Sequence, residues 1–520
     1  MQHAPFRKHF WFFSATALML AIAACSGGND ATSGSSDAAS DQSASDDATS
    51  TTAGGLSGGM LFRVNVPANT PPEDEITLWL QGNIPVPMQE AAPGVFTATV
   101  TAQTEPGAVR YRYTRNQFNF PGAEYLEPDR NDYFWSQYGR SVSFSAGTTQ
   151  TDTITRWRWF PASGTWPTTV PSLTAGPISP RTTGAGLSIG AYLADLWEPA
   201  FALTLTATAN RLHDRGFRYA LLSPPWQVST LDPVPEIDNL IDENPNYPDD
   251  KLAAQVRSLA DAGIDVIMQP QVHPKGYNIG SRPASWWDAW FSTLTAMHVH
   301  HAKIAAANGA RFYAFYPDGL HNDPPDPNAD SHWRSLLQAV RNVFPGQVGI
   351  NIWQFSDAGG TSYVIPATTA ISFWDAIDFI SYQISGQLVP DASPTDEQLA
   401  DAASGLLAPV VAVARLHSLP ITVEPSYASV ARSWRGTSFY SVNLQNAVYD
   451  GEDEWQQGTW QYSDTDQARV MHAFMAAAAT TPEVLAVLPF GYWPMDFPLS
   501  PDFSVRAKAA ELILMRWTTP

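Results

Sequence analysis

From residue 184 to the C-terminus, short apolar runs alternate with segments in which apolar residues recur at helical spacing. Repeated strand–helix alternation of this kind is typical of a parallel sheet, and eight repeats predict a closed (β/α)8 barrel with long loops. Strands are expected near 186–192, 217–222, 264–268, 311–316, 348–353, 377–382, 419–424 and 484–490, and helices near 249–263, 286–308, 333–340, 395–417, 464–480 and 504–515.

The preceding hundred residues follow a different pattern. Between residues 59 and 160, short runs alternate apolar and polar residues and are separated by Gly, Pro and Asn, which predicts a small antiparallel β-sandwich. Its expected strands are 61–66, 76–80, 95–100 and 108–113. Residues 161–183 are rich in Pro, Thr, Ser and Gly and read as a linker, so a multidomain chain with its barrel at 184–520 is expected.

The N-terminus carries a targeting pattern. Arg7 and Lys8 precede an almost wholly apolar run that ends in Ile22-Ala23-Ala24-Cys25, which resembles a bacterial lipoprotein signal peptide. Residues 1–24 would then be removed and the Cys25 thiol lipidated, anchoring the chain in the cell envelope, at the outer membrane where the host has one. Residues 25–58, rich in Ser, Asp, Ala and Thr, would be a disordered tether. The alternative is an ordinary secretory signal with an incidental cysteine.

The composition limits which binding partners are expected. The net charge of −21 argues against nucleic acid and against an anionic membrane surface, so membrane contact is expected only through the lipid anchor. The many aromatic residues (19 Trp, 18 Tyr and 25 Phe) suit either a core or the C–H faces of sugars. The sequence has no Gly-rich phosphate loop or dinucleotide fingerprint, and no cofactor is expected. The spacing of His298, His300 and His301 is not a usual zinc pattern; a solvated helix face is expected, and no metal.

One carboxylate stands at a position that favours catalysis. The apolar run 419–423 is followed by Glu424 and then by Pro425, which cannot donate to a sheet ladder, so the strand is expected to end at Glu424. In a parallel barrel this ending lies at the C-terminal mouth, where active sites form. The alternative is an exposed strand-end residue in a salt bridge.

Four stretches together resemble the retaining glycoside hydrolases of clan A, most closely family 113, whose known members are β-mannanases. They are 247–252 with 262–270, 374–382, 421–427 and 490–493. The resemblance implies that Glu424 is the nucleophile and that Trp493 lies under the sugar. It also implies a Glu acid/base at the end of the fourth strand, but Tyr316-Pro317-Asp318-Gly319-Leu320 stands there. Asp318 is the candidate acid/base; a plain Pro-Asp-Gly turn is the alternative, with Asp323 and Asp326 as rival donors.

Other side chains are placed at the mouth by their positions. Trp197, Trp226, Trp353 and Trp493 follow the expected strands one, two, five and eight, and are candidate sugar-stacking residues or core. Gln271 and His273 follow the third strand and are candidate sugar contacts. Tyr382 ends the sixth strand, where it is expected to hydrogen-bond Glu424.

The predicted function is a glycoside hydrolase that acts on a β-linked poly- or oligosaccharide with two carboxyl groups and retention of configuration. The sandwich resembles starch-binding-type modules of family 20, with Trp135, Trp157 and Trp159 as candidate stacking or core residues. Two alternatives remain open: a non-catalytic glycan-binding surface lipoprotein, and a transglycosidase or α-glucan-active enzyme.

Overall fold

The structure is a computed structural model, and it describes fifteen stretches of the chain. These are residues 59–80, 84–101, 108–116, 140–157, 160–161, 173, 186–193, 199–239, 249–274, 281–317, 320, 325–356, 361–436, 461–493 and 496–517. The predicted signal peptide, tether and Cys25, nearly all of the predicted linker, and Trp135, Trp159, Trp197, Asp318 and Asp323 lie outside them.

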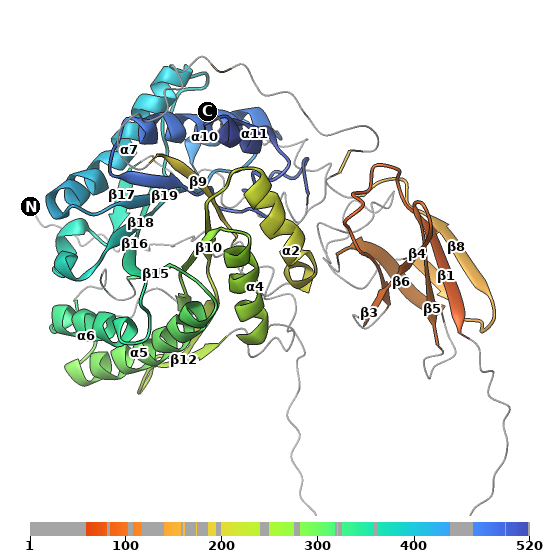
Figure 1. The fold of residues 1–520 in the computed structure, drawn as a ribbon, viewed down its shortest axis with the longest axis horizontal. Coiled ribbons are helices and arrows are strands. Elements are labelled where there is room, and N and C mark those ends of the chain that lie inside the picture. The colour runs from red at the N-terminus through yellow and green to blue at the C-terminus, as the bar shows by residue number, and fades with distance from the viewer. Residues whose placement is uncertain are drawn as a thin grey trace, which may run out of the picture.

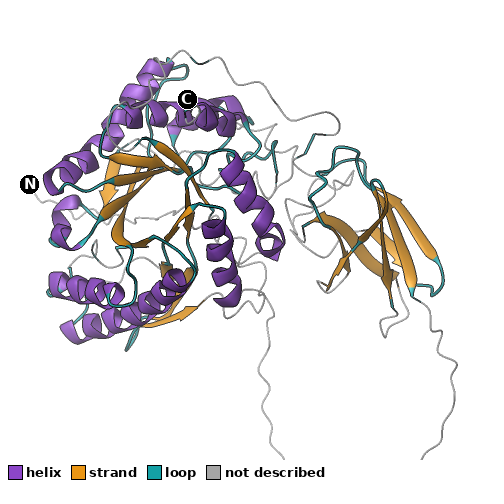
Figure 2. Cartoon of the chain, in the orientation of Figure 1, coloured by secondary structure: helices purple, strands orange, loops and turns teal. Residues whose placement is uncertain are grey.

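Eight strands close into a parallel barrel, which confirms the predicted fold of the C-terminal part (Figures 1 and 2). Neighbouring strands pair in parallel throughout, and the pairing of β15 with β16 closes the ring. In chain order the strands are β9 (Ser188–Tyr192), β10 (Tyr219–Leu222), β13 (Asp265–Met268), β15 (Phe312–Phe315), β16 (Gln347–Ser356), β18 (Phe379–Ile384), β19 (Ile421–Pro425) and β20 (Val484–Val487).

Helices surround the strands (Figure 2). They are α2 (Pro199–Asp214), α4 (Asp249–Asp261), α5 (Ala284–Ala307), α6 (Ala329–Arg341), α7 (Asp396–His417), α10 (Asp464–Ala479) and α11 (Ala509–Arg516). Two of these helices begin at a side-chain cap. Thr395 forms a capping box with Gln398 at the start of α7, and Ser463 accepts from the Asp466 amide at the start of α10. Helix α7 is long and apolar enough to cross a membrane, but here its apolar residues pack against the barrel and α10.

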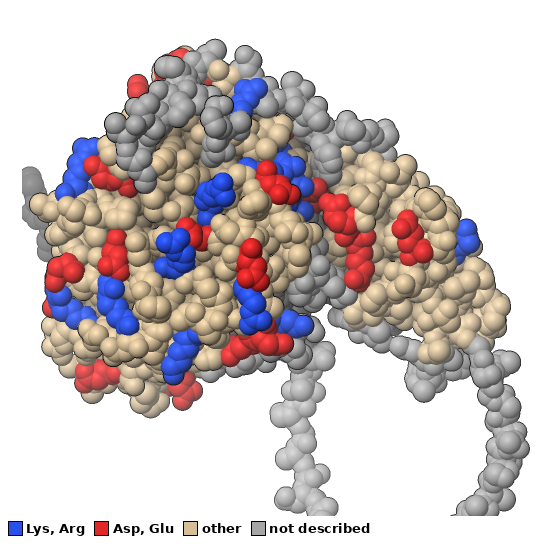
Figure 3. Space-filling view, viewed as in Figure 1, with Lys and Arg blue, Asp and Glu red and all other residues tan. Residues whose placement is uncertain are grey.

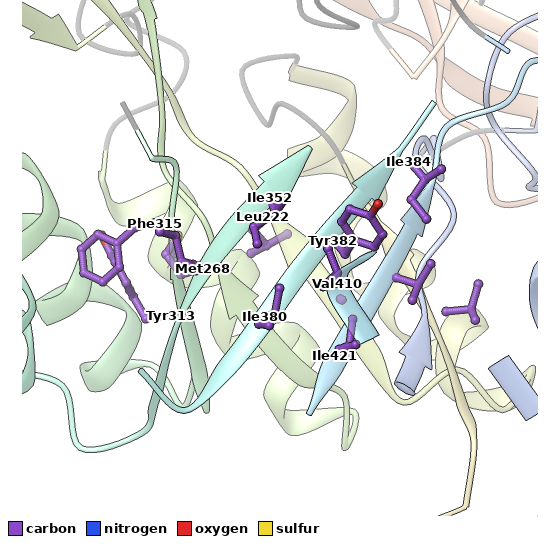
Figure 4. Close-up of a cluster of buried hydrophobic side chains, with 14 of the residues drawn as sticks. Leu222, Met268, Tyr313, Phe315, Ile352, Ile380, Tyr382, Ile384, Val410 and Ile421 are labelled. Carbon is purple, nitrogen blue, oxygen red and sulfur yellow. The ribbon is translucent and has the colours of Figure 1, made fainter. Parts of the chain in front are cut away.

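Strand alternation divides the core of the barrel into two clusters. Outward side chains such as Ile380, Tyr382 and Ile421 pack beneath the helices (Figure 4). Inward side chains such as Phe312, Phe379 and Leu488 fill the interior. Since both faces of every strand are covered, the strands are apolar on both sides, and a polar inward residue is an exception that needs a reason.

Several short elements were not expected from the sequence. A three-stranded sheet continues past β10 and β13 and comprises β11 (Pro225–Thr230), β12 (Glu236–Asn239) and β14 (Gln271–Pro274). Strand β17 (Ser362–Ile365) forms an antiparallel hairpin with β16. Three 3₁₀ turns are η1 (Thr368–Ala370), η2 (Trp374–Ala376) and η3 (Ser433–Arg435).

The N-terminal part forms two four-stranded sheets, hereafter the two-sheet unit, ordered β4-β5-β1-β8 and β3-β2-β6-β7. The strands are β1 (Met60–Asn65), β2 (Ile76–Leu80), β3 (Ile84–Pro87), β4 (Gln89–Ala92), β5 (Val95–Val100), β6 (Ala108–Arg115), β7 (Arg140–Ser143) and β8 (Thr149–Thr153). Both sheets contribute to one hydrophobic core. The sheets are not wholly antiparallel, because β1 pairs with β8 in parallel. Trp157 is a core residue whose indole N–H donates to Thr70.

Over the barrel in Figure 3, Lys and Arg are interspersed with Asp and Glu, whereas Asp and Glu predominate on the visible face of the two-sheet unit.

Candidate active site

Glu424 is the centre of the candidate site. It is the fourth residue of β19, and it points inward because Ile421 and Val423, of opposite parity, pack under the helices. Its side chain lies at the carboxyl end of the strand and is 0% exposed. The salt-bridge alternative is not observed, since no described Lys, Arg or His pairs with Glu424.

Polar side chains from two other strands contact the carboxyl group, and a third polar side chain lies behind one of them. Ser381 of β18 donates its hydroxyl to Oε1, and Asn351 of β16 places Nδ2 3.5 Å from Oε2. Ser381 also lies 2.8 Å from Oε1 of Gln269, which follows β13 on the other side of the barrel. All four residues are buried, so they form a polar layer across the barrel interior.

Burial controls the protonation of Glu424. Removal from water raises the pKa of its carboxyl to about 8, and the hydrogen bonds from Ser381 and Thr422 only partly oppose this effect. A serine hydroxyl holds one hydrogen, so Ser381 cannot donate to Glu424 and Gln269 together. With Glu424 protonated, the carboxyl donates to Ser381, which donates to Gln269. With Glu424 ionised, Ser381 donates to the carboxylate.

Two buried polar atoms of this layer have no hydrogen-bond partner in the part of the chain described: Asn351 Oδ1 and Gln269 Nε2. Buried amide groups are normally paired, because leaving one unpaired costs on the order of 1–3 kcal/mol. Asn351 Oδ1 is an acceptor and Gln269 Nε2 is a donor, and a sugar hydroxyl can donate to the first or accept from the second.

Gln383, the next inward residue of β18 after Ser381 toward the mouth, belongs to a second polar group. Tyr316, which follows the fourth barrel strand β15, donates its hydroxyl to Gln383 Oε1 at 2.9 Å. Gln383 in turn places Nε2 3.4 Å from Ser426 Oγ. Tyr316 begins the stretch 316–320, where the resemblance implies an acid/base Glu, and Asp318 is two residues beyond it.

Three of the predicted mouth residues lie at the carboxyl end of the barrel. Trp353 shares the inward face of β16 with Asn351, is half-buried and donates to Ser385 Oγ at 3.2 Å. Trp493 follows β20, is half-buried and donates to Asp502 Oδ2 at 2.9 Å. Gln271 is buried, and its Nε2 donates to the Tyr192 hydroxyl at 2.5 Å. His273 lies in β14, and its side chain is outside the description.

The expectation for Tyr382 is wrong. Tyr382 does not bond Glu424: it points outward (Figure 4), and its hydroxyl donates to the Leu406 carbonyl of α7 at 2.9 Å. The reason is strand parity, because the inward position belongs to its neighbour Ser381.

Of the two alternatives for Trp226, the structure favours the core. Trp226 lies in β11, outside the eight barrel strands, packs against the core beneath the helices and donates to His301 Nε2 of α5 at 2.6 Å.

Asp326 is engaged in the turn before α6. Its carboxylate accepts from the Asn328 amide at 2.9 Å and contacts His332 Nδ1 at 2.7 Å, so both of its oxygens have partners.

The expectation of a solvated histidine face on α5 also fails for two of three residues. His298 and His301 are buried against Tyr313 and Trp226, and burial lowers the pKa of both, that of His298 to about 3. Both are neutral packing residues at physiological pH. Only His300 is exposed, beside Asp249.

Sequence reasoning missed Ser381, Asn351, Gln269 and Tyr316. A signal for the first three was present: each is polar within or next to an apolar run that the barrel buries on both faces. Asn351 and Ser381 have apolar neighbours on either side, so an inward polar position was readable before the structure.

One family model matches the central part of the barrel. Residues 209–402 match the model of Glycoside Hydrolase Family 113. The barrel carries a glycosidase domain. The match runs from α2 to the start of α7 and ends before Glu424, so it covers strands two to six of the glycosidase barrel and says nothing of the seventh. No curated protein matches the sequence.

Solved structures give weak likenesses to this glycosidase. A GH113 β-1,4-mannanase complex has 17% identity and a TM-score of 0.44 over 64% of this chain and 98% of that one. The GH113 β-mannanase AaManA from Alicyclobacillus acidocaldarius, in complex with ManMIm, has 17% identity and a TM-score of 0.44 over 64% and 97%. A GH53 catalytic domain from Ignisphaera aggregans has 12% identity and a TM-score of 0.38 over 68% and 100%. At these TM-scores the likenesses add nothing about the site.

Proposed function

We propose that the glycosidase domain hydrolyses a β-linked poly- or oligosaccharide with retention of configuration, and that Glu424 is its nucleophile. The observation that carries the proposal is the position of Glu424: inward, at the carboxyl end of the seventh barrel strand, with Ser381 and Asn351 hydrogen-bonded to its two oxygens. A nucleophile has to be held in one orientation, and these two donors hold it.

In this mechanism the Glu424 carboxylate attacks the anomeric carbon while an acid protonates the leaving oxygen, and water then releases the glycosyl group. Glu424 must lose its proton before it attacks. Once it is ionised, the Ser381 hydroxyl and the Asn351 amide donate to its two oxygens. Asp318 is the proposed acid/base, and retention requires its carboxyl to lie about 5–5.5 Å from that of Glu424.

Trp353 and Trp493 are the proposed sugar-stacking residues, with Gln271 as a polar sugar contact. His273 and Trp197 keep their proposed roles by position in the sequence. The unpaired Asn351 Oδ1 and Gln269 Nε2 are further candidates for sugar hydroxyls.

The test is the Glu424→Gln variant of residues 59–520, assayed on a glycan panel beside wild type. Gln is nearly isosteric but cannot attack, so turnover should fall by several orders of magnitude while glycan binding survives. Glu483→Gln is the matched control, because Glu483 pairs with Arg415 at the opposite end of β20 and should keep full activity. Full activity of Glu424→Gln would exclude the proposed role.

One observation favours a second candidate, a barrel that binds glycans without cleaving them. At the end of the fourth strand, the inward side chain is Tyr316, hydrogen-bonded to Gln383, where the resemblance implies the acid/base. Binding by the wild type without turnover on a broad panel would support this candidate.

We further propose that the two-sheet unit is a carbohydrate-binding-like sandwich and that the chain is anchored in the cell envelope by a lipid on Cys25. The first rests on the shared core of the two sheets and the second on the Cys25 sequence pattern.

A further inference from the structure

A buried arginine of the two-sheet unit reaches the barrel. Arg115, the last residue of β6, is 0% exposed, and its Nε donates to Asp74 Oδ2 at 2.5 Å within the unit. Its Nη1 donates to the carbonyl oxygen of Asp496 at 3.2 Å, across 381 residues of chain. The guanidinium lies 4.6 Å from the Phe160 ring and 5.8 Å from that of Phe497. Aromatic rings from both parts of the chain thus flank one cation.

Asp496 is the centre of an ion network on the barrel side. Arg506 Nε donates to its Oδ1 at 2.7 Å, and Arg211 of α2 lies 3.3 Å from its carboxylate. Burial alone would raise the pKa of Asp496, but the two arginines outweigh it and hold that pKa below its usual range. Asp496 is therefore anionic, and its side chain is fully engaged by the barrel while its carbonyl is engaged by Arg115.

The same network holds Trp493. Arg506 Nη1 donates to the Trp493 carbonyl at 3.2 Å, and the indole N–H donates to Asp502 at 2.9 Å. The Trp493 amide donates to Ser504 Oγ at 3.2 Å, and the Val505 amide donates to the Gly491 carbonyl at 3.2 Å. The segments 491–493 and 496–506 are therefore one connected structure with the proposed stacking tryptophan at its start.

We propose that Arg115 is a positioning residue: by holding the Asp496 carbonyl, the two-sheet unit fixes the segment after β20 and so the orientation of Trp493 at the barrel mouth. The contact itself is independent of the proposed function, whereas its consequence for substrate binding rests on it.

The physical reason is the cost of releasing the contact. Nη2 of this buried guanidinium already has no hydrogen-bond partner in the part of the chain that the structure describes, and loss of the Asp496 carbonyl would leave Nη1 without that partner as well. Separation of the two parts would also remove the contact of the guanidinium with the Phe497 ring, 5.8 Å away. The linker composition predicts that residues 184–520 fold and act alone; the Arg115 contact predicts instead that the barrel needs the two-sheet unit to order its mouth.

The test compares the full chain with Arg115→Met, Arg115→Lys and, as the matched control, Arg140→Met. Arg140 also pairs with an aspartate, Asp152, and this ion pair lies within the two-sheet unit. The first readout is hydrogen–deuterium exchange of peptides covering 488–506, with peptides from β16 and β18 as the internal reference. Arg115→Met should speed exchange of 488–506 at least tenfold and leave the reference unchanged, Arg140→Met should change neither, and Arg115→Lys should restore part of the protection.

The second readout is steady-state hydrolysis of a soluble oligosaccharide. Arg115→Met should raise KM several-fold with a smaller change in kcat, because stacking on Trp493 contributes to binding. A wild type without turnover would refute the proposed function and leave the exchange test valid.

Unchanged exchange of 488–506 in Arg115→Met would overturn the proposal. If Arg115→Met unfolds the two-sheet unit, which fast exchange in β2 and β6 would show, the exchange of 488–506 still decides the proposal. In that case 488–506 must still lose protection while the reference peptides keep theirs.

Discussion

Ser381 on β18 places its hydroxyl against the carboxyl group of Glu424 on the neighbouring strand β19. The same hydroxyl lies 2.8 Å from Gln269 across the barrel. Because it has one hydrogen to donate, the direction of these bonds follows the protonation of Glu424. Ser381 thereby partly offsets the effect of burial on the ionisation of the proposed nucleophile.

Ser381→Ala should weaken activity in a pH-dependent manner. The variant removes a hydrogen bond that lowers the Glu424 pKa, so that pKa should rise and the carboxylate should be scarcer at neutral pH. We expect kcat/KM at pH 7 to fall about 10–100-fold, with partial recovery at higher pH. Ser404→Ala, on the exposed side of α7, is the control and should match wild type. A uniform loss at every pH would contradict the proposed effect on ionisation.

The wild-type pH profile should report the role of Glu424. A nucleophile must be ionised, so kcat/KM should rise with pH and level off above the pKa of about 8. The substrate should carry an activated leaving group, which needs no protonation, so that titration of the acid does not enter the profile. The measurement is kcat/KM from pH 5 to 10, and a rate that does not rise across pH 7–9 would exclude Glu424 as the nucleophile.

Glu424→Gln should stabilise the fold in alkaline solution. The pKa of about 8 in the folded state exceeds the ordinary glutamate pKa of 4.5, so the folded state holds the proton more tightly and Glu424 costs stability as pH rises from 4.5 to 8. Above both values the cost is on the order of 5 kcal/mol, and below pH 4 it vanishes. Thermal unfolding should therefore show a Tm gain for the variant at pH 8.5 that shrinks toward pH 4.5. An equal Tm difference at both pH values would refute the raised pKa.

Asp318→Asn should separate the two steps of hydrolysis if Asp318 is the acid/base. Substrates with activated leaving groups need no protonation and should be spared in the first step, while azide should replace activated water in the second. A β-azide product, identified by NMR, would also report retention. Normal activity of Asp318→Asn beside a dead Glu424→Gln would move the acid role elsewhere, with Asp323 the next candidate.

Cys25→Ala should release the protein from membranes. Lipidation needs the Cys25 thiol, so the variant should lose labelling by a fatty-acid probe and appear in the soluble fraction after cell lysis. Wild type grown in parallel provides the reference. Membrane association that persists in the variant would disprove the anchor.

Local patterns in the sequence determined the elements. The apolar alternation of 76–80 is strand β2, and the helix expected near 464–480 is α10, because these signals depend on residues within one or two turns. Pro425 likewise marked the end of β19 and put Glu424 at the mouth. The eight repeats were sufficient to predict the barrel, since few other arrangements bury so many strands on both faces.

The tertiary structure decided what surrounds those elements. Whether Ser381 or Tyr382 faces inward depends on the register of β18 against its neighbours, which a one-residue shift would reverse. The approach of Gln269 to Ser381 spans 112 residues and that of Arg115 to Asp496 spans 381. The proton affinity of Glu424 has the same origin: desolvation by residues brought together from separate strands raises its pKa, and no stretch of sequence around Glu424 contains that information.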